Sequence, residues 1–224
     1  MADHDILTGS TERHLRRLNP AQSIMIHAQV VEPFVALQTQ AAKQGFDLQI
    51  CSGFRSFERQ LHIWNGKLSG LRPVVDKAGN PIVLEALSPW DQIQAVLRWS
   101  ALPGASRHHW GTDFDVYDAA AMPEGYQIQL TPEEVEGAGI FAPMHDWLDR
   151  SFDGDSLGFY RPYGTDKGGV APERWHLSYA PIADIYAREH SADVIAERLA
   201  GSELLLLDVV LENLDEIVRR FVQV

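Results

Sequence analysis

The amino-terminal part of the chain has the pattern of one helix interrupted by a proline. Asn19-Pro20 is typical of a helix start, because asparagine caps a first turn and proline fits the first helical position. Five apolar residues then follow at helical spacing: Ile26, Val30, Phe34, Leu37 and Ala41. Pro33 lies inside this stripe and predicts a kink or two abutting helices, and Gly45 ends the pattern.

Three short segments have the pattern of strands. Asp47–Cys51 alternates polar and apolar residues, as a half-buried strand does. Thr112–Tyr117 and Trp175–Tyr179 are the other two. In Thr112–Tyr117, Asp113 and Asp115 share one face, while Phe114 and Val116 point to the other. Together with the helices, the strands predict an α+β fold in which helices flank a small antiparallel sheet.

Further helices are predicted from their start signals. We expect helices over residues 56–65, 88–98 and 144–150, and a capped helix start at Thr131-Pro132. The segment Gly66–Leu87, between the first two, is rich in glycine and proline. We expect it to form a long loop or weak hairpin that could cover a functional site.

The last part of the chain is predicted to be helical. Two helices follow Ser191 and are separated at Gly201-Ser202. An apolar stripe runs along the second: Leu206, Val209, Val210, Leu214, Ile217 and Phe221. We expect this stripe to pack within the molecule in preference to forming a dimer helix. The chain is therefore divided into a main domain, residues 1–190, and a helical extension, residues 191–224, packed on it.

Composition limits the classes of partner. The 224 residues are 45% hydrophobic and 22% charged, which is ordinary for a soluble globular protein. A net charge of -12 without any basic run argues against nucleic acid as a partner and against adsorption to anionic membranes. No apolar stretch is long enough to span a bilayer. The oligomeric state is left open.

The amino terminus and the cysteine content bear on the compartment. Residues Met1–Asp5 have neither the positive nor the apolar region of a signal peptide. We therefore expect a cytoplasmic protein, with the periplasm or cell envelope as the alternative if a signal has been removed. The single cysteine, Cys51, lies in an apolar strand and is expected to be a buried, inert thiol.

Two segments far apart in the chain supply the ligand types of a catalytic metal. The stretch Ser106–Asp115 contains His108, and Glu173-Arg174-Trp175-His176 follows downstream. Catalytic zinc uses three nitrogen or oxygen ligands and leaves a fourth position for water, whose proton a nearby glutamate can take. These residues favour a hydrolytic metalloenzyme. Asp113 and Asp115 are both candidates for the carboxylate ligand. Whichever of the two does not bind the metal would accept a hydrogen bond from a ligating imidazole.

Three motifs in this order carry a family resemblance. Ser106–Asp115 matches a Ser-x-His-x-x-Gly-x-x-x-Asp signature, and Glu173-Arg174-Trp175-His176 matches Glu-x-Trp-His. Ser52-Gly53-Phe54-Arg55-Ser56 is close to Ser-Gly-Tyr-Arg-Ser. The set resembles the VanY-type zinc D-alanyl-D-alanine carboxypeptidases. Two positions depart from the family pattern: Phe54 stands where tyrosine is common, and Asp113 where alanine is frequent.

The resemblance implies a fold, a cofactor and roles for seven residues. The fold would be that of the hedgehog/D,D-peptidase proteins, with one zinc ion per chain bound in residues 1–190. The implied metal ligands are His108, Asp115 and His176. Glu173 would be the catalytic base and Arg55 the cation facing the substrate carbonyl. Ser106 and Gln60 would bind the substrate.

The implied reaction is hydrolysis of the terminal D-alanyl-D-alanine bond of a peptidoglycan stem peptide or muropeptide. The same metal core serves several cuts, so a peptidoglycan endopeptidase acting on an L-alanyl-D-glutamate or cross-bridge bond is one alternative. A non-catalytic zinc-binding module of the same fold is another. The presence of Glu173 argues against the module, because four protein ligands usually close a structural zinc site.

Overall fold

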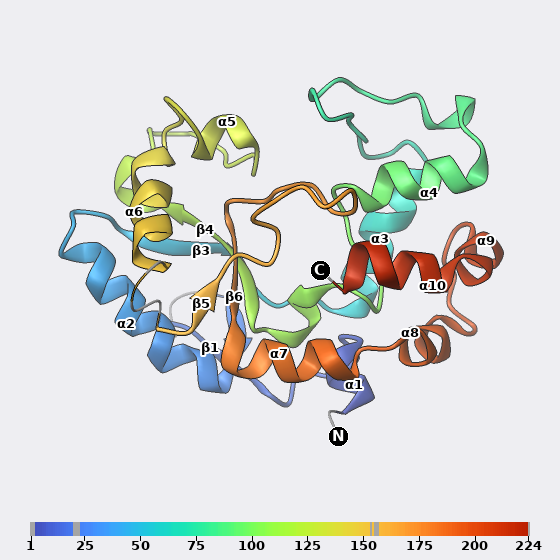
Figure 1. The fold of residues 1–224 in the computed structure, drawn as a ribbon, viewed down its shortest axis with the longest axis horizontal. Helices are drawn as coiled ribbons and strands as arrows, with labels where there is room; N and C mark the ends of the chain where they lie inside the picture. Colours follow the sequence, from blue (N-terminus) through green and yellow to red (C-terminus); the bar gives the residue numbers. More distant parts are fainter. Residues whose placement is uncertain (1–2, 20–22, 153, 155–156, 224) are drawn as a thin grey trace.

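The computed structural model describes the chain except for residues 1–2, 20–22, 153, 155–156 and 224. Within the described residues, the centre of the molecule is a four-stranded antiparallel sheet (Figure 1). Its strands lie in the order β3 (Leu48–Ser52), β4 (Asp113–Asp118), β6 (His176–Tyr179) and β5 (Phe159–Tyr160). The predicted α+β fold with a small antiparallel sheet is confirmed.

One face of this sheet is covered by two helices, α2 (Val31–Ala42) and α6 (Ala142–Phe152) (Figure 1). Phe114 and Val116 of β4 are buried in the same apolar cluster as residues of both helices. Side chains alternate along a strand, so Asp113 and Asp115 point away from this cluster. The sheet therefore has one apolar face and one face that carries carboxylates.

A second apolar cluster joins α3 (Phe57–Leu68) and α4 (Pro89–Leu97) to the helices near the carboxyl end. Those helices are α8 (Ala192–Leu199), α9 (Leu207–Glu212), α10 (Leu214–Ile217) and the π-helical segment η5 (Val218–Val222). The four stripe residues buried in this cluster are Val210, Leu214, Ile217 and Phe221. The stripe thus packs inside the molecule, against α3 and α4.

The remaining elements are mostly short. They are α1 (His4–Leu7), β1 (Leu15–Arg17), β2 (Met25–His27), α5 (Pro132–Val135), α7 (Ala180–Glu189) and four 3-10 turns: η1 (Ala28–Val30), η2 (Leu84–Ala86), η3 (Arg107–Trp110) and η4 (Ala119–Ala121). The helix starts predicted at residues 56 and 88 are confirmed, because the hydroxyls of Ser56 and Ser88 cap α3 and α4. Between these helices the chain forms a loop closed by a bridge between Val75 and Pro81, as expected.

The predicted amino-terminal helix is wrong in its first half. Asn19-Pro20 runs into residues outside the described part of the chain, and Met25–His27 forms β2, paired antiparallel with β1. The helix α2 begins only at Val31. Pro33 therefore lies in its first turn, where the missing N–H has no partner to lose. No described helix is long and apolar enough to cross a membrane.

Candidate active site

Three buried side chains from different elements meet at the carboxylate-bearing face of the sheet. His108 belongs to η3, Asp115 to β4, and His176 begins β6, where it pairs in register with Asp115. One potential ligand atom of each lies within 4.8 Å of the others. The Nε2 atom of His108 is 3.5 Å from Oδ2 of Asp115, and Nδ1 of His176 is 3.4 Å from Oδ1 of the same carboxylate. The structure thus brings together the three residues expected as metal ligands.

Gly111 makes the turn that places His108 over β4. It ends η3 with a φ of 67°, in the left-handed region that favours glycine. Its carbonyl accepts a hydrogen bond from the backbone N–H of His27 at 2.8 Å. A Cβ atom at this position would lie 2.8 Å from that same nitrogen, so the turn and its contact with β2 both require glycine.

Hydrogen bonds to the outer nitrogen of each imidazole fix which nitrogen faces the site. Nδ1 of His108 donates to the carbonyl of Gly53 at 3.0 Å, and Nε2 of His176 donates to Oδ1 of Asp113 at 3.2 Å. Among the described residues, Nδ1 of His176 and Oδ1 of Asp115 have no hydrogen-bond partner. Buried polar atoms are rarely left unsatisfied. This donor set, two nitrogens and a carboxylate with unsatisfied atoms facing one point, fits a bound metal ion.

The electrostatics of the site agree with this fit. Burial opposes the charge on Asp115, but the imidazoles of His108 and His176 outweigh it and hold the pKa of the carboxyl well below its usual range. Burial also opposes a proton on His176, yet the nearby carboxylates of Asp113, Asp115 and Glu173 outweigh it and raise the pKa of that imidazole. The carboxylates therefore attract positive charge to His176, and a metal cation can take the place of the proton.

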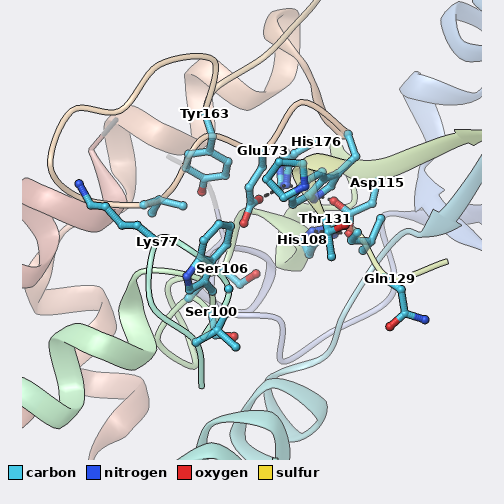
Figure 2. A pocket seen from close by; sticks show the side chains of 18 of the residues that line it. Lys77, Ser100, Ser106, His108, Asp115, Gln129, Thr131, Tyr163, Glu173 and His176 are labelled. Atoms are coloured by element: carbon cyan, nitrogen blue, oxygen red, sulfur yellow. Dashed lines mark ion pairs between the residues drawn. The ribbon is translucent and has the colours of Figure 1, made fainter. Parts of the chain in front are cut away.

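Glu173 lies beside the three residues, in the loop before β6. Its Oε2 atom is 3.4 Å from Nδ1 of His176, and Figure 2 shows its carboxylate directed into the pocket. The next residue anchors the loop, because Arg174 forms ion pairs with Asp146 and Asp149 of α6. A carboxylate held beside the candidate metal site in this way can accept a proton from a molecule bound there.

The site opens into a pocket of about 410 Å³ (Figure 2). The loop over residues 75–79 and the segment over residues 129–133 both contribute to its walls, so part of the loop that was expected to cover a functional site lines this pocket. Aromatic side chains line it as well: Trp99, Tyr163 and Trp175. A pocket with apolar walls and a few converging polar groups is the usual form of a small-ligand site.

Arg55 and Ser106 line this pocket, whereas Gln60 does not. Gln60 is fully buried, accepts a hydrogen bond from Nη1 of Arg55 at 2.9 Å and donates to the carbonyl of Ala101 at 2.6 Å. Ser52 accepts a second bond from Arg55, from Nη2, at 3.2 Å. The side chain of Gln60 is thus behind Arg55 and holds it, and the carboxamide does not face the pocket.

Sequence reasoning missed Lys67, which lines the same pocket from the last turn of α3. Its ammonium group forms no hydrogen bond or ion pair with the described residues. Burial lowers its pKa to about 8, with Glu173 opposing this shift and Arg72 and Arg55 adding to it. The sequence did contain a sign of this position: Lys67 follows the candidate residue Gln60 by seven residues and therefore lies on the same face of α3.

Comparison with known proteins gives the same fold and family. Residues 23–182 match the VanY family, described as D-alanyl-D-alanine carboxypeptidase. An uncharacterized protein of Haemophilus influenzae is 48% identical over 100 residues, which are 44% of this chain and 68% of that protein.

Two solved structures share the fold. The vancomycin-resistance D,D-pentapeptidase VanY, crystallised as a mutant in complex with Zn(II), matches with a TM-score of 0.51 and 23% identity, over 80% of this chain and 92% of its own. The vancomycin-resistance D,D-dipeptidase VanXYg, in complex with a D-Ala-D-Ala phosphinate analog, matches with a TM-score of 0.51 and 17% identity, over 85% of this chain and 63% of its own. The expected D,D-peptidase fold is confirmed. With the family match over most of its length, the chain belongs to the VanY D-alanyl-D-alanine carboxypeptidase family.

Proposed function

We propose that this protein is a zinc-dependent carboxypeptidase that removes the terminal D-alanine from peptidoglycan stem peptides ending in D-alanyl-D-alanine. The observation that carries the proposal is the convergence of His108, Asp115 and His176, with unsatisfied buried atoms, beside Glu173 in one pocket. Membership of the VanY family supports the reaction class. The Zn(II) complex of the VanY relative supports the choice of metal.

Nε2 of His108, the carboxylate of Asp115 and Nδ1 of His176 would hold the ion, since these atoms face one another while the outer nitrogens are engaged elsewhere. Three nitrogen and oxygen ligands with one position left open are typical of catalytic zinc. When bound, such an ion polarises a carbonyl and makes water more acidic.

The protein's own groups supply the proton transfer and the orientation. Glu173 takes a proton from the attacking water at its carboxylate and passes it to the amine of the departing D-alanine. Arg55, held by Gln60 and Ser52, presents its guanidinium to the carbonyl oxygen on which charge develops. Because Gln60 already uses both ends of its carboxamide, its proposed part is to position Arg55.

Residues that can grip a free carboxylate favour a carboxypeptidase over an endopeptidase. The ammonium group of Lys67 and the hydroxyl of Ser106 both belong to the pocket wall. A site that expects a carboxylate leaves its donors unpaired when the substrate has none, so discrimination should be large.

The test is to incubate the zinc-loaded protein with a synthetic stem pentapeptide ending in D-alanyl-D-alanine and to identify the products by mass spectrometry. We expect loss of one residue from the free acid and slow cleavage of its carboxyl-terminal amide. The variant Glu173→Gln should keep its zinc and lose about 10²- to 10⁴-fold in rate, whereas His176→Ala should lose zinc. Fragments from the middle of the peptide would point to the endopeptidase, and near-normal turnover of Glu173→Gln would remove Glu173 as the base.

A further inference from the structure

We infer that Arg107 and Asp113 form a unit that orients His176 so that its Nδ1 atom binds the metal. The inference rests on the proposed metal site and concerns two residues outside the ligand set. Both side chains are almost completely buried, with 3% exposure for Arg107 and 0% for Asp113.

Asp113 is a fully engaged carboxylate on the same strand face as Asp115. Its Oδ1 atom accepts a hydrogen bond from Nε of Arg107 at 2.7 Å and one from Nε2 of His176 at 3.2 Å. Its Oδ2 atom accepts from the hydroxyl of Thr112 at 2.7 Å. With these partners Asp113 is not available as a ligand, which resolves the choice between the two carboxylates in favour of Asp115.

Arg107 is itself held from several sides. Its Nη2 atom donates to the hydroxyl of Ser178 at 2.8 Å and to that of Tyr160 at 2.9 Å. Its guanidinium lies over the ring of Trp110, with the central carbon 4.7 Å from the ring centroid. Since these partners come from β5, β6 and η3, the guanidinium is a fixed donor, and the carboxylate that it binds has a fixed position too.

This fixed carboxylate selects one nitrogen of His176. An acceptor at Nε2 keeps the hydrogen on that atom and leaves the lone pair on Nδ1, which faces Asp115. His108 is arranged in the opposite sense, because its Nδ1 atom is the one engaged, by Gly53. Without an acceptor at residue 113, the ring of His176 could turn over and present either nitrogen.

The pair also avoids adding net charge to the site. Asp113 alone would be a further buried anion beside Asp115 and Glu173, and Arg107 balances it. Removing only one partner would leave the other charge buried and unpaired, which is costly for the fold. The two residues are therefore expected to act together, and the experiment must change them both singly and as a pair.

The experiment measures zinc affinity of the full-length protein by competition with a chromophoric chelator. Asp113→Ala should weaken zinc binding by about 10- to 100-fold, as loss of an imidazole's outer partner typically does. Asp113→Asn should weaken it less, because the amide oxygen can still accept from Nε2. The matched control is Asp118→Asn on the same strand, where the buried carboxylate caps the backbone at Asp47 and Ala120, and its zinc affinity should not change.

A paired variant separates orientation from folding. Arg107→Met with Asp113→Ala removes the unpaired charge, so it should melt at a higher temperature than Asp113→Ala alone while its zinc affinity stays low. In the zinc-loaded wild type, ¹⁵N NMR should show Nδ1 of His176 as the coordinating atom. In Asp113→Ala it should show a mixture in which either nitrogen of His176 coordinates zinc.

Three outcomes would overturn the inference: wild-type affinity in Asp113→Ala, full recovery of affinity in the paired variant, or coordination by Nε2 in the wild type. Absence of zinc binding by the wild type would instead contradict the proposed function, so the two failures are distinguishable.

Discussion

At the scale of single residues, the pocket contains a cation that no described residue pairs with directly. Lys67 lines the pocket without a hydrogen bond or ion pair to the described residues, and burial lowers its pKa to about 8. A half-buried ammonium group loses hydration that an anion can replace. The free carboxylate of a peptide would be such an anion, at the end of the substrate where a carboxypeptidase needs to recognise it.

Replacing this cation should therefore affect one class of substrate. A hydrogen bond to a charged group is worth about 1.5–3 kcal/mol, so Lys67→Gln should lower kcat/KM for the free-acid peptide by roughly 10- to 100-fold. Activity on the peptide amide should change little. The lowered pKa also predicts that KM for the acid rises as the pH passes about 8, because the ammonium group then loses its proton.

The control for this variant is Lys77→Gln. Lys77 also lines the pocket, but its side chain is 75% exposed and its Nζ atom lies 3.2 Å from Asp166. Steady-state kinetics with both peptides should show a normal acid preference in this control. An equal loss for acid and amide in Lys67→Gln would contradict the carboxylate role.

The roles of single residues were predicted unevenly from the sequence. His108, Asp115 and His176 were singled out because their residue types suit a metal and because their motifs resemble those of the VanY-type peptidases, and the structure brings them together. The environment of Gln60 was not predictable, because it depends on the carbonyl of Ala101, which the fold brings up from a distant segment. The spacing of residues along the chain does not show whether a side chain faces a pocket or lies behind its wall.

At the scale of elements, the turn between η3 and β4 tolerates only glycine at residue 111 without strain. Gly111→Ala should destabilise the fold by more than the roughly 1–2 kcal/mol that a left-handed conformation costs an alanine, because the new methyl group also meets the backbone of β2. Displacement of η3 should weaken zinc binding through His108. Urea unfolding followed by tryptophan fluorescence, together with the zinc titration, measures both effects.

Gly45→Ala is the matched control for this turn. Gly45 has a φ of 89° and no atom within 4 Å of the position of an added Cβ, so only the conformational cost applies there. If the two variants lose the same stability, the contact with β2 does not contribute.

Elements were predictable where they carry their own signal. The capping serines predict the starts of α3 and α4, and the alternation of polar and apolar residues predicts β3. Strand β2 was missed because Ile26 also fits the helical spacing that continues into α2, and its partner β1 has only three residues. Helix α7 was missed because Ala183 is its only buried residue among those described, which is too little for an apolar stripe.

At the scale of the whole molecule, stability should depend on keeping several buried histidines uncharged. Burial is the largest cause that lowers the pKa of each: His14 to about 4, His109 to about 3, His145 to about 3 and His190 to about 4. In the unfolded chain a histidine titrates near 6.5. Between about pH 6.5 and 4 the unfolded state therefore binds more protons than the folded state.

The free energy of unfolding should consequently fall as the pH is lowered through that range. Each such histidine contributes at most about 1.4 kcal/mol per pH unit. His176, whose pKa is raised, acts at higher pH. Its contribution to the free energy of unfolding is complete below about pH 6.5 and is lost as the pH rises through the raised pKa. Urea unfolding of the metal-free protein at a series of pH values measures the slope. His145→Leu should flatten it, and a wild-type profile level from pH 6.5 to 4.5 would refute the prediction.

The helical segment at the end of the chain contacts the loop that leads to the site. Arg220 of η5 donates to the carbonyl of Gly168 at 3.2 Å, and a side-chain carbon at Gly169 would collide with the carbonyl oxygen of Arg220. The loop that starts at these glycines reaches Glu173 four residues after Gly169. By reciprocity, a ligand that favours one position of this loop favours the docked tail by the same free energy. Through these two contacts, docking of η5 and the position of the loop that carries Glu173 depend on each other.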